Sequence, residues 1–397
     1  MKQRNLLAAF SVAHFAHHVT NSLLSALLPF MVLDGLVTSN TLAGFAVTAS
    51  AVASGVTSPP FGVLADRVGA RRVIVGGLLL IGVASVLIGV SGSYPLLLIG
   101  LLVMGIASGT YHAPASALIA EVFPFARRGV ALGTHTTAGH LAFFAAPLLA
   151  GVLAAQETGG SWRIPYLLFA IAPVLCGLLL LRVAPPGARS TEPHQWLATF
   201  TDVGRVARAV GSLVVFSILA QVLISSALAF LALYLVTARG VSPALAAALF
   251  GVPQLAGLVA APLSGVLSDR FGRPAILMGA LIVSGPALWL LTAMPIELVV
   301  IPLLLIGACV SFRATATEVL IIDNTPVTRR STVLGSYYLI NQPVGGIAAP
   351  IFGAIADAAG IGTAFSWLAL ALVVFSAIAL VASATGAARI RAASSPG

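Results

Sequence analysis

The chain has 397 residues, of which 59% are hydrophobic and 8% are charged, and its mean hydropathy is +1.06. Soluble domains carry a charge on about a quarter of their residues, so this composition excludes a soluble protein and indicates an all-α protein that crosses the membrane many times. The 20 Lys and Arg against 11 Asp and Glu give a net charge of +9. In a soluble domain that excess would suggest nucleic acid, but in a membrane protein it reflects basic loops, and no nucleic-acid partner is expected.

Twelve apolar segments follow one another along the chain, and each is long enough for a membrane-spanning helix of roughly 20 residues. The apolar runs are continuous and do not alternate with polar residues, which excludes the strands of a membrane β-barrel. The predicted spans are 6–30, 41–64, 73–91, 95–120, 129–154, 163–183, 210–236, 243–267, 275–293, 297–322, 332–356 and 362–384.

The basic residues between the spans predict the orientation of the chain. With the N-terminus inside, 17 of the 20 Lys and Arg lie on the cytoplasmic side, Arg163 and Arg239 lie on the opposite side, and Arg313 lies within a span. Membrane proteins retain basic residues in their cytoplasmic loops. We therefore expect both termini in the cytoplasm and the protein in a bacterial-style inner membrane.

The sequence contains no cofactor motif. Lys2 is the only lysine, which excludes a phosphate-binding GxxxxGK[ST] loop and a retinal Schiff base within the membrane. Cys176 and Cys309 both lie in apolar runs and form no metal or disulfide pattern. No cofactor is therefore expected.

The chain divides into two similar halves. The longest hydrophilic stretch, 185–208, separates an N-terminal unit of six spans, 1–184, from a C-terminal unit of six spans, 209–397. The sequence Gly-Val-Leu-Ala-Asp-Arg-Val-Gly at 62–69 recurs as Gly-Val-Leu-Ser-Asp-Arg-Phe-Gly at 265–272. Repeated halves are typical of secondary transporters, whose substrate site lies between the repeats.

The repeated loop resembles the signature of the major facilitator superfamily, and it lies between the second and third spans of each half. Its residues are Gly62, Asp66, Arg67, Gly69 and Arg71 in the first half, and Gly265, Asp269, Arg270 and Gly272 in the second. The resemblance covers essentially the whole chain. It implies two six-helix bundles that rock about a central cavity lined by spans 1, 4, 7 and 10, with loops that change their contacts between conformations.

Shorter segments are similar to drug exporters of that superfamily. Span five carries Ala146-Pro147-Leu-Leu-Ala150-Gly151 where many exporters carry Gly-Pro-x-x-Gly-Gly. The fosmidomycin-resistance group is similar at Ser11-Val-Ala-His14, Gly109-Thr-Tyr111-His112 and Ala131-Leu-Gly133. This chain has His18 near the position of a carboxylate in that group, and Ala113 separates His112 from Pro114.

Polar side chains within the predicted spans are the candidate site, because such groups are costly in a bilayer and are usually functional. His14, His17, His18 and Asn21 stand at i, i+3, i+4 and i+7 in span one, which places them on one face of a helix. The remaining candidates for the substrate and proton pathway are Tyr111, His112, His135, His140, Gln221, Arg313, Glu318 and Asn341.

Three interpretations of these groups stay open. Histidines and Glu318 could carry protons while Arg313 attracts an anionic or polar substrate. His14 and His18 could be a pair of metal ligands at i and i+4, although no Cys, Asp or Glu within span one joins them, and the predicted site includes no metal. Alternatively, the histidines could be structural and bonded to neighbouring hydroxyl or carbonyl groups.

The function predicted from these observations is a monomeric secondary transporter that exports a small organic molecule by alternating access, coupled to protons. Proton-coupled uptake of an organic anion is the alternative, followed by transport of a metal ion. A membrane-embedded hydrolase would need an HExxH-like constellation, and a channel would need a filter-like segment. Neither pattern is present.

Overall fold

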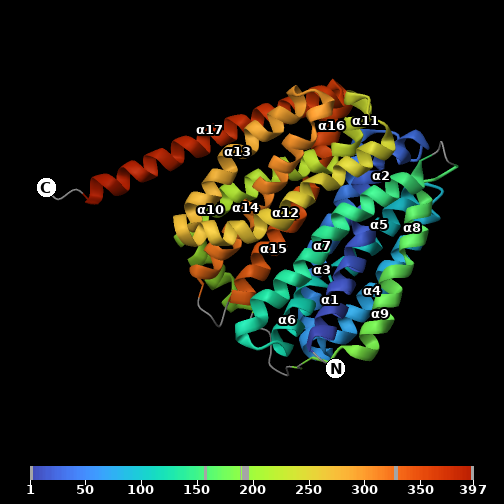
Figure 1. Cartoon of the computed structure of the whole chain (residues 1–397), viewed down its shortest axis with the longest axis horizontal. Helices are drawn as coiled ribbons and strands as arrows, with labels where there is room; N and C mark the ends of the chain where they lie inside the picture. Colours follow the sequence, from blue (N-terminus) through green and yellow to red (C-terminus); the bar gives the residue numbers. More distant parts are fainter. Residues whose placement is uncertain (1–2, 156–158, 188, 190–195, 326–329, 395–397) are drawn as a thin grey trace.

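The computed structural model describes residues 3–155, 159–187, 189, 196–325 and 330–394, and within these residues the chain forms helices and no strand (Figure 1). Twelve single or broken helices are long and apolar enough to cross a membrane, which confirms the predicted number of spans. In chain order these are α1 and α2 (Gln3–Asn21, Leu23–Leu33), α3 (Asn40–Val68), α4 (Ala70–Gly89), α5 and α6 (Tyr94–Ser108, His112–Val122), α7 (Phe125–Ala154), α8 and α9 (Arg163–Phe169, Ile171–Val183), α10 and α11 (Trp196–Ala229, Leu231–Arg239), α12 (Pro243–Phe271), α13 (Arg273–Ala293), α14 (Val300–Asp323), α15 and α16 (Arg330–Ile347, Ala349–Ala359) and α17 (Ile361–Ser394).

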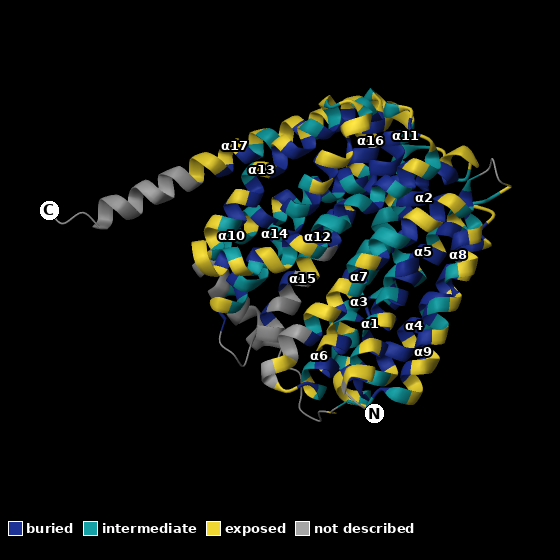
Figure 2. Ribbon diagram, in the orientation of Figure 1, coloured by how far each residue is buried: buried dark blue, intermediate teal, exposed yellow. Residues whose placement is uncertain are grey.

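The outer surface of the helices is apolar, as a surface in contact with lipid must be. Large hydrophobic side chains such as Val152, Leu175, Val259 and Leu370 are more than half exposed. Exposed residues alternate along the outer helices with buried ones that face the interior (Figure 2). Such extensive apolar exposure is unfavourable in water and is expected where lipid tails take the place of water.

The first half, α1 to α9, and the second half, α10 to α17, turn alike at their repeated loops. Gly69 lies between α3 and α4 with φ +96° and ψ 132°, and Gly272 lies between α12 and α13 with φ +88° and ψ 145°. This positive φ is accessible to glycine and strained for other residues. The repeated glycine of the sequence motif is therefore explained by a shared backbone conformation.

The predicted linker 185–208 is partly helical. Helix α10 begins at Trp196 and continues into span seven, and residues 190–195 of the linker lie outside the described residues. At its start, Arg71 donates a hydrogen bond from Nη1 to the carbonyl oxygen of Ala184 at 2.9 Å. The beginning of the linker is thus attached to the loop that contains Gly69.

The two halves pack closely at the end where α2 packs against α11 and α3 against α16 (Figure 1). Small residues allow the helices to approach: a Cβ added to Gly44 would lie 2.5 Å from the Cα of Pro350, and one added to Gly151 would lie 2.8 Å from the carbonyl oxygen of Ala244. Glycine at such positions lets two membrane helices come into backbone contact.

A carboxylate of the second half completes this contact. Asp357 accepts hydrogen bonds from the backbone N–H groups of Asn40 and Thr41 at 2.7 and 2.9 Å, and from their side chains at 2.8 and 2.6 Å. These two residues begin α3, so the negative charge also lies at the positive end of a helix dipole. We call this contact the Asp357 clasp.

Toward the opposite end of the molecule, where α1 begins, helices α3, α7 and α12 leave more space around their glycines. Among the described residues, a Cβ added to Gly62 of α3, Gly133 of α7 or Gly265 of α12 would meet no atom within 4 Å. The described structure is therefore asymmetric, with tight packing between the halves at the end of the Asp357 clasp and looser packing at the end of the repeated loops.

Candidate functional site

Histidines from three spans gather inside the first half. His14, His17 and His18 lie on α1, which ends at Asn21, and their rings lie 4.6 to 6.3 Å apart between centroids. The spacing i, i+3, i+4 thus does place the three rings together. We call these three residues, with His112 and His135, the histidine cluster.

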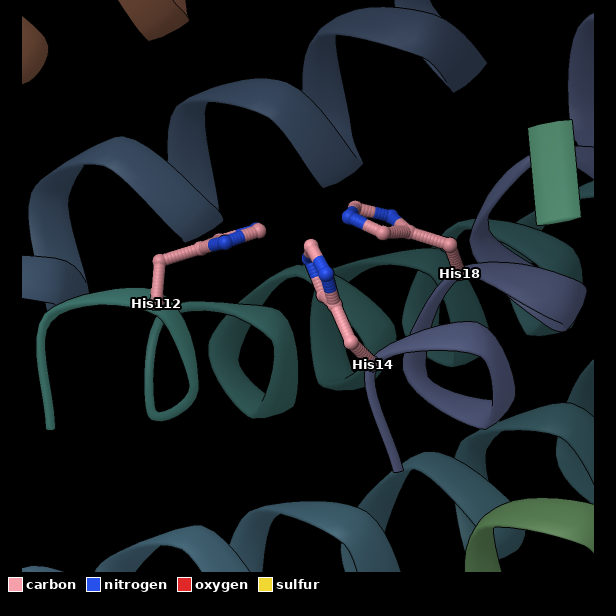
Figure 3. A group of neighbouring side chains, drawn as sticks. All are labelled: His14, His18 and His112. Carbon is pink, nitrogen blue, oxygen red and sulfur yellow. The ribbon is translucent and has the colours of Figure 1, made fainter. Parts of the chain in front are cut away.

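His112 joins the cluster because span four is broken. Helix α5 ends at Ser108 and α6 begins at His112, and the intervening residues pack tightly, with Gly109 directly against Thr57 and Ser54 of α3. The His112 ring lies 5.4 Å from that of His14 and 5.1 Å from that of His18. Figure 3 shows the rings of His14, His18 and His112 turned toward one another.

Tyr111 is part of the wall of the cluster. Its ring is fully buried and stacks on His17 with 4.5 Å between centroids. Its hydroxyl donates a hydrogen bond to the carbonyl oxygen of Phe10 at 3.2 Å. The hydroxyl is therefore directed into the backbone of α1, and the aromatic face is what Tyr111 presents to the histidines.

Helix α7 closes the cluster from the other side. His14 Nδ1 lies 2.6 Å from the carbonyl oxygen of His135, and the two rings stack at 4.1 Å. Gly139, one turn further along α7, leaves room for the rings: an added Cβ would lie 2.7 Å from His14 Cε1 and 3.1 Å from His18 Cδ2.

The histidine cluster contains polar atoms that the chain does not satisfy. Within the described residues, Nε2 of His14 and Nδ1 of His17, His18 and His135 are buried without a hydrogen-bond partner. A buried polar group without a partner typically costs about 1–3 kcal/mol. Four such atoms in one cluster make it the leading candidate site of the first half.

Two further candidates from the same faces lie apart from this arrangement. Asn21, the last residue of α1, donates a hydrogen bond from Nδ2 to the carbonyl oxygen of His17 at 2.6 Å. Its amide nitrogen is therefore bound to the backbone of its own helix. His140 of α7 forms a hydrogen bond through Nδ1 with Oε1 of Gln254 in α12, at 3.0 Å. His140 therefore bridges the two halves.

Arg313 is the centre of a second polar group, inside the second half. Its side chain is buried, with Nη1 donating to the Ser217 hydroxyl and carbonyl oxygens at 2.9 and 3.3 Å and Nη2 donating to Gln221 Oε1. Ser217 in turn shares a hydrogen bond of 2.8 Å with Thr317, and Tyr337 is a further neighbour of the guanidinium. We call Arg313, Ser217, Gln221, Thr317 and Tyr337 the arginine site.

The sequence prediction included Arg313 and Gln221 but missed Ser217 and Thr317 as site residues. Each lies four residues from a predicted member, Ser217 before Gln221 and Thr317 after Arg313, and four residues is one helical turn. That spacing is the signal that could have found them. Glu318, next to Thr317, is half-buried on α14, and Asn341 is half-buried on α15 with Oδ1 unpartnered among the described residues.

The two repeated loops differ in their contacts. In the second, Arg273 binds Asp269 at 2.5 Å and Asp323 at 3.2 Å. Asp66 and Arg67 of the first loop, and Arg270 of the second, are exposed, while Gly69 is enclosed by the Pro186 carbonyl of the linker. The first loop is therefore joined to the linker and the second to the end of α14.

Comparison with known proteins gives consistent matches over the length of the chain. The multidrug resistance proteins MdtG of Citrobacter koseri and of a Rahnella species are 27% and 29% identical to it, over 95% and 94% of this chain and 94% and 92% of theirs. Among solved structures, the nucleoside transporter NupG, as a D323A mutant, superposes with a TM-score of 0.78 at 14% identity, over 95% of this chain and 98% of that one. A bacterial homologue of the human lysosomal transporter Spinster superposes with a TM-score of 0.75 at 17% identity, over 95% of each chain.

The family comparison agrees with the fold. The model of the Major Facilitator Superfamily matches residues 10–226 and again residues 213–394, once for each half. Two matches in tandem are what the repeated loops and the repeated turn at Gly69 and Gly272 lead one to expect. The chain belongs to the Major Facilitator Superfamily, and it is a multi-pass membrane transporter rather than a membrane-embedded enzyme.

Proposed function

We propose that this transporter exports small organic molecules from the cytoplasm across a bacterial inner membrane, in exchange for protons. The observation that carries the proposal is the pairing of two buried polar sites, the histidine cluster in the first half and the arginine site in the second. The similarity to the MdtG multidrug resistance proteins over more than nine-tenths of the chain supports export rather than uptake.

The asymmetry between the two ends of the molecule supports alternating access. The halves, which we assign to residues 1–184 and 209–397, are held together by the Asp357 clasp and by glycine contacts at one end. At the other end, Gly62, Gly133 and Gly265 have space around them. With both termini in the cytoplasm, as the charge distribution predicts, this conformation would be closed to the outside, and rocking of the halves would reverse it.

Substrate recognition is assigned to the arginine site and its surroundings. A guanidinium stays charged at any physiological pH. The side chains that accept hydrogen bonds from Arg313 are those of Ser217 and Gln221, and both are uncharged. An anionic or strongly polar group on the substrate would therefore be attracted to it. The same attraction would serve an importer of organic anions, so the direction of transport is the point that an experiment must resolve.

Proton coupling is assigned to Glu318 and to the histidine cluster. Imidazole changes its charge between about pH 5 and 8, and a carboxyl group in a membrane helix is costly when charged. Protons that enter from outside would bind these groups and lower the affinity for the outgoing substrate. Because the coupling is reciprocal, bound substrate would disfavour the protons by the same factor.

Counterflow in proteoliposomes, with a panel of labelled organic cations, anions and neutral compounds, tests the proposal. We expect exchange without a pH gradient, and net movement against the proton gradient when one is imposed. Glu318→Gln should retain exchange but lose the response to the gradient. Accumulation of an organic anion together with protons would instead establish uptake, and transport indifferent to pH in both proteins would contradict proton coupling.

The orientation is tested with single cysteines at two exposed positions, Arg189 in the linker and Glu297 between α13 and α14. The native Cys176 and Cys309 are buried and are replaced beforehand. A reagent that cannot cross the membrane should label position 297 in intact cells and position 189 only after the cells are opened. The reverse pattern would invert the proposed direction. Crosslinking and size-exclusion chromatography at low detergent check the proposed monomer.

A further inference from the structure

Three imidazoles of the histidine cluster share a geometry that the proposed export of organic molecules does not require. One ring nitrogen from each of His14, His18 and His112 lies within 4.8 Å of the other two (Figure 3). Two of the residues are one turn apart on α1, and the third comes from the first residue of α6. The rings approach one another from two different spans, so the arrangement does not follow from the helical repeat of α1 alone.

The hydrogen bond of His14 leaves its second nitrogen ready to bind a ligand. Its Nδ1 lies 2.6 Å from the carbonyl oxygen of His135, and a carbonyl can only accept, so Nδ1 carries the proton. In the neutral ring the lone pair is then on Nε2, and Nε2 is buried without a hydrogen-bond partner among the described residues. Histidines that bind metals typically donate their other N–H to a carbonyl or carboxylate in this way.

His18 offers a second buried nitrogen, Nδ1, that also has no partner among the described residues. Hydrogen bonds cannot be made between two neutral rings that each present a lone pair, and buried polar atoms that stay unpaired are costly. A cation placed between the rings would bind several lone pairs at once. We propose that His14, His18 and His112 bind a divalent late first-row metal ion of the zinc type.

The chemistry of the three ligands selects the class of metal. Imidazole suits Zn²⁺, Cu²⁺, Ni²⁺ and Co²⁺, whereas Mg²⁺ and Ca²⁺ require oxygen ligands. Two hydroxyl groups lie beside the cluster. That of Tyr111 is directed to the Phe10 carbonyl, and that of Ser108 lies 3.3 Å from Nε2 of His17, which is not one of the three proposed ligands. His17 packs edge-on against His18 with 4.6 Å between ring centroids, and His135 stacks on His14 at 4.1 Å, so both rings shield the site.

A small movement would bring the ligands to bonding distance. Zinc binds imidazole nitrogen at about 2.0–2.1 Å in a tetrahedron, which places two ligand nitrogens about 3.3 Å apart. The nitrogens lie within 4.8 Å of one another here, so each pair must close by no more than about 1.5 Å. His112 follows the break between α5 and α6, where side-chain rotation and a shift of the first turn can supply that movement.

Three protein ligands leave one tetrahedral position for a ligand from outside the chain. Zinc sites of this kind hold a water or another small donor in the fourth position. The site is carried by α1 and α6 in the first half, and the arginine site lies in the second half. Metal binding does not depend on the proposed export function, because it requires only the three imidazoles.

Zinc binding is measured by isothermal titration on the full chain, purified without a polyhistidine tag in detergent micelles at pH 7.5. We expect one ion per chain. Co²⁺ in place of Zn²⁺ should give the intense visible absorption of a tetrahedral complex. His14→Ala and His112→Ala should each weaken Zn²⁺ binding at least about a hundredfold, more than the loss of an outer partner typically causes.

Two further variants keep the test decisive. His112→Cys supplies another zinc ligand, so it should retain binding and add a sulfur-to-cobalt charge-transfer band that the unaltered chain lacks. His140→Ala should leave the affinity unchanged, because His140 is bonded to Gln254. His194, which lies outside the described residues, is the only other histidine, and His194→Ala should likewise bind normally.

The proposal is overturned if Zn²⁺ does not bind stoichiometrically, or if His14→Ala and His112→Ala bind as the unaltered chain does. It is also overturned if His194→Ala alone removes binding. Circular dichroism and size-exclusion profiles verify that each variant is folded. If His112→Ala does not fold, the cobalt spectrum of His112→Cys still decides, since absence of the sulfur band would exclude position 112 as a ligand. Zinc binding without transport would leave this site standing, and transport without zinc binding would leave the proposed function standing.

Discussion

The two halves of the molecule share a fold but differ in how far their buried polar groups are satisfied. In the first half the histidine cluster leaves four ring nitrogens without a partner among the described residues. In the second half Ser217 and Gln221 bind both terminal nitrogens of the Arg313 guanidinium, and two atoms, Arg313 Nε and Asn341 Oδ1, have no partner among the described residues.

At the end of the molecule that carries the Asp357 clasp, the halves differ in the charge of the group that binds an arginine. Arg163 of the first half binds the carboxylate of Asp34 at 2.7 Å, whereas Arg239 of the second half donates to the carbonyl oxygens of Leu291 and Met294. At these sites the first half uses groups that gain or lose protons, and the second half uses arginines on uncharged acceptors. This difference fits the proposed roles, in which the histidine cluster of the first half binds protons and the arginine site of the second half binds the charged or polar group of the substrate.

The largest test of this difference is Arg313→Ala. A hydrogen bond between the substrate and the charged guanidinium would contribute about 1.5–3 kcal/mol. The substitution removes this bond and the attraction of the positive charge, so we expect substrate binding to fall at least about a hundredfold. Scintillation proximity binding with the labelled substrate measures it. Arg313→Lys should recover part of the binding, since the charge returns without the planar fork. Unaltered binding in Arg313→Ala would move the substrate site away from the second half.

A matched pair of glycine substitutions tests whether the loops differ as the halves do. Gly69→Ala and Gly272→Ala both force a side chain into positive φ, which costs about 1–2 kcal/mol. At Gly69 the new Cβ would also lie 2.7 Å from the carbonyl oxygen of Pro186, while at Gly272 the nearest atom is 4.0 Å away. We expect Gly69→Ala to lower the free energy of unfolding by about 1–3 kcal/mol more than Gly272→Ala. Equal losses in thermal unfolding of the two variants would show that the linker moves aside freely.

The loop carboxylates give a smaller, functional contrast. Asp66→Asn should lower the transport rate about tenfold while the protein still inserts, a change within the usual range of coupling between conformations. Asp269→Asn should have less effect, because Arg273 keeps Asp323 as a partner. Initial rates in proteoliposomes at equal protein content provide the comparison. A rate for Asp66→Asn equal to that of the unaltered chain would remove the role assigned to this loop.

The smallest effect concerns pH and the pair of Asp34 with Arg163. Burial by itself raises the pKa of the Asp34 carboxyl, but hydrogen bonds from Trp162 and Arg163 and the charge of Arg163 outweigh it and lower the pKa below its usual value. Stability from this pair is therefore fully present above the unfolded-state pKa of about 3.9 and is lost as the pH falls through the lower folded value. Asp34→Asn should abolish that acid-dependent part of the thermal stability. A melting profile that loses the same stability below about pH 4 in both proteins would assign the loss to other groups.

Much of the fold could be predicted because it depends on composition and on chain-wide repeats. Continuous apolar runs locate the twelve spans to within a few residues, and the repeated glycines mark a backbone turn that other residues cannot adopt without strain. Within α1, spacing alone places His14, His17 and His18 on one side. Each of these properties depends on residues that are close together in the sequence, so each can be predicted from the sequence.

The composition of the two sites depends on how helices are broken and rotated against each other. His112 reaches the cluster because α5 and α6 are separate helices, and Ser217 reaches Arg313 because α10 and α14 face each other there. Asn21 has the right spacing to join the histidines, but it binds the backbone where α1 ends. The spacing of one helical turn could have indicated Ser217 next to Gln221, but no periodicity along a single span shows which helix faces Arg313.

The Asp357 clasp makes the start of one helix depend on a residue more than three hundred positions away. The N–H groups of Asn40 and Thr41 are among the first of α3, which have no acceptor within their own helix, and here the carboxylate of Asp357 supplies it. When the halves separate at this end, those amides must pass to water. Hydrogen–deuterium exchange at Asn40 and Thr41 should therefore be slow in the conformation described here and fast in the opposite one, so two amides would report the direction in which the transporter faces.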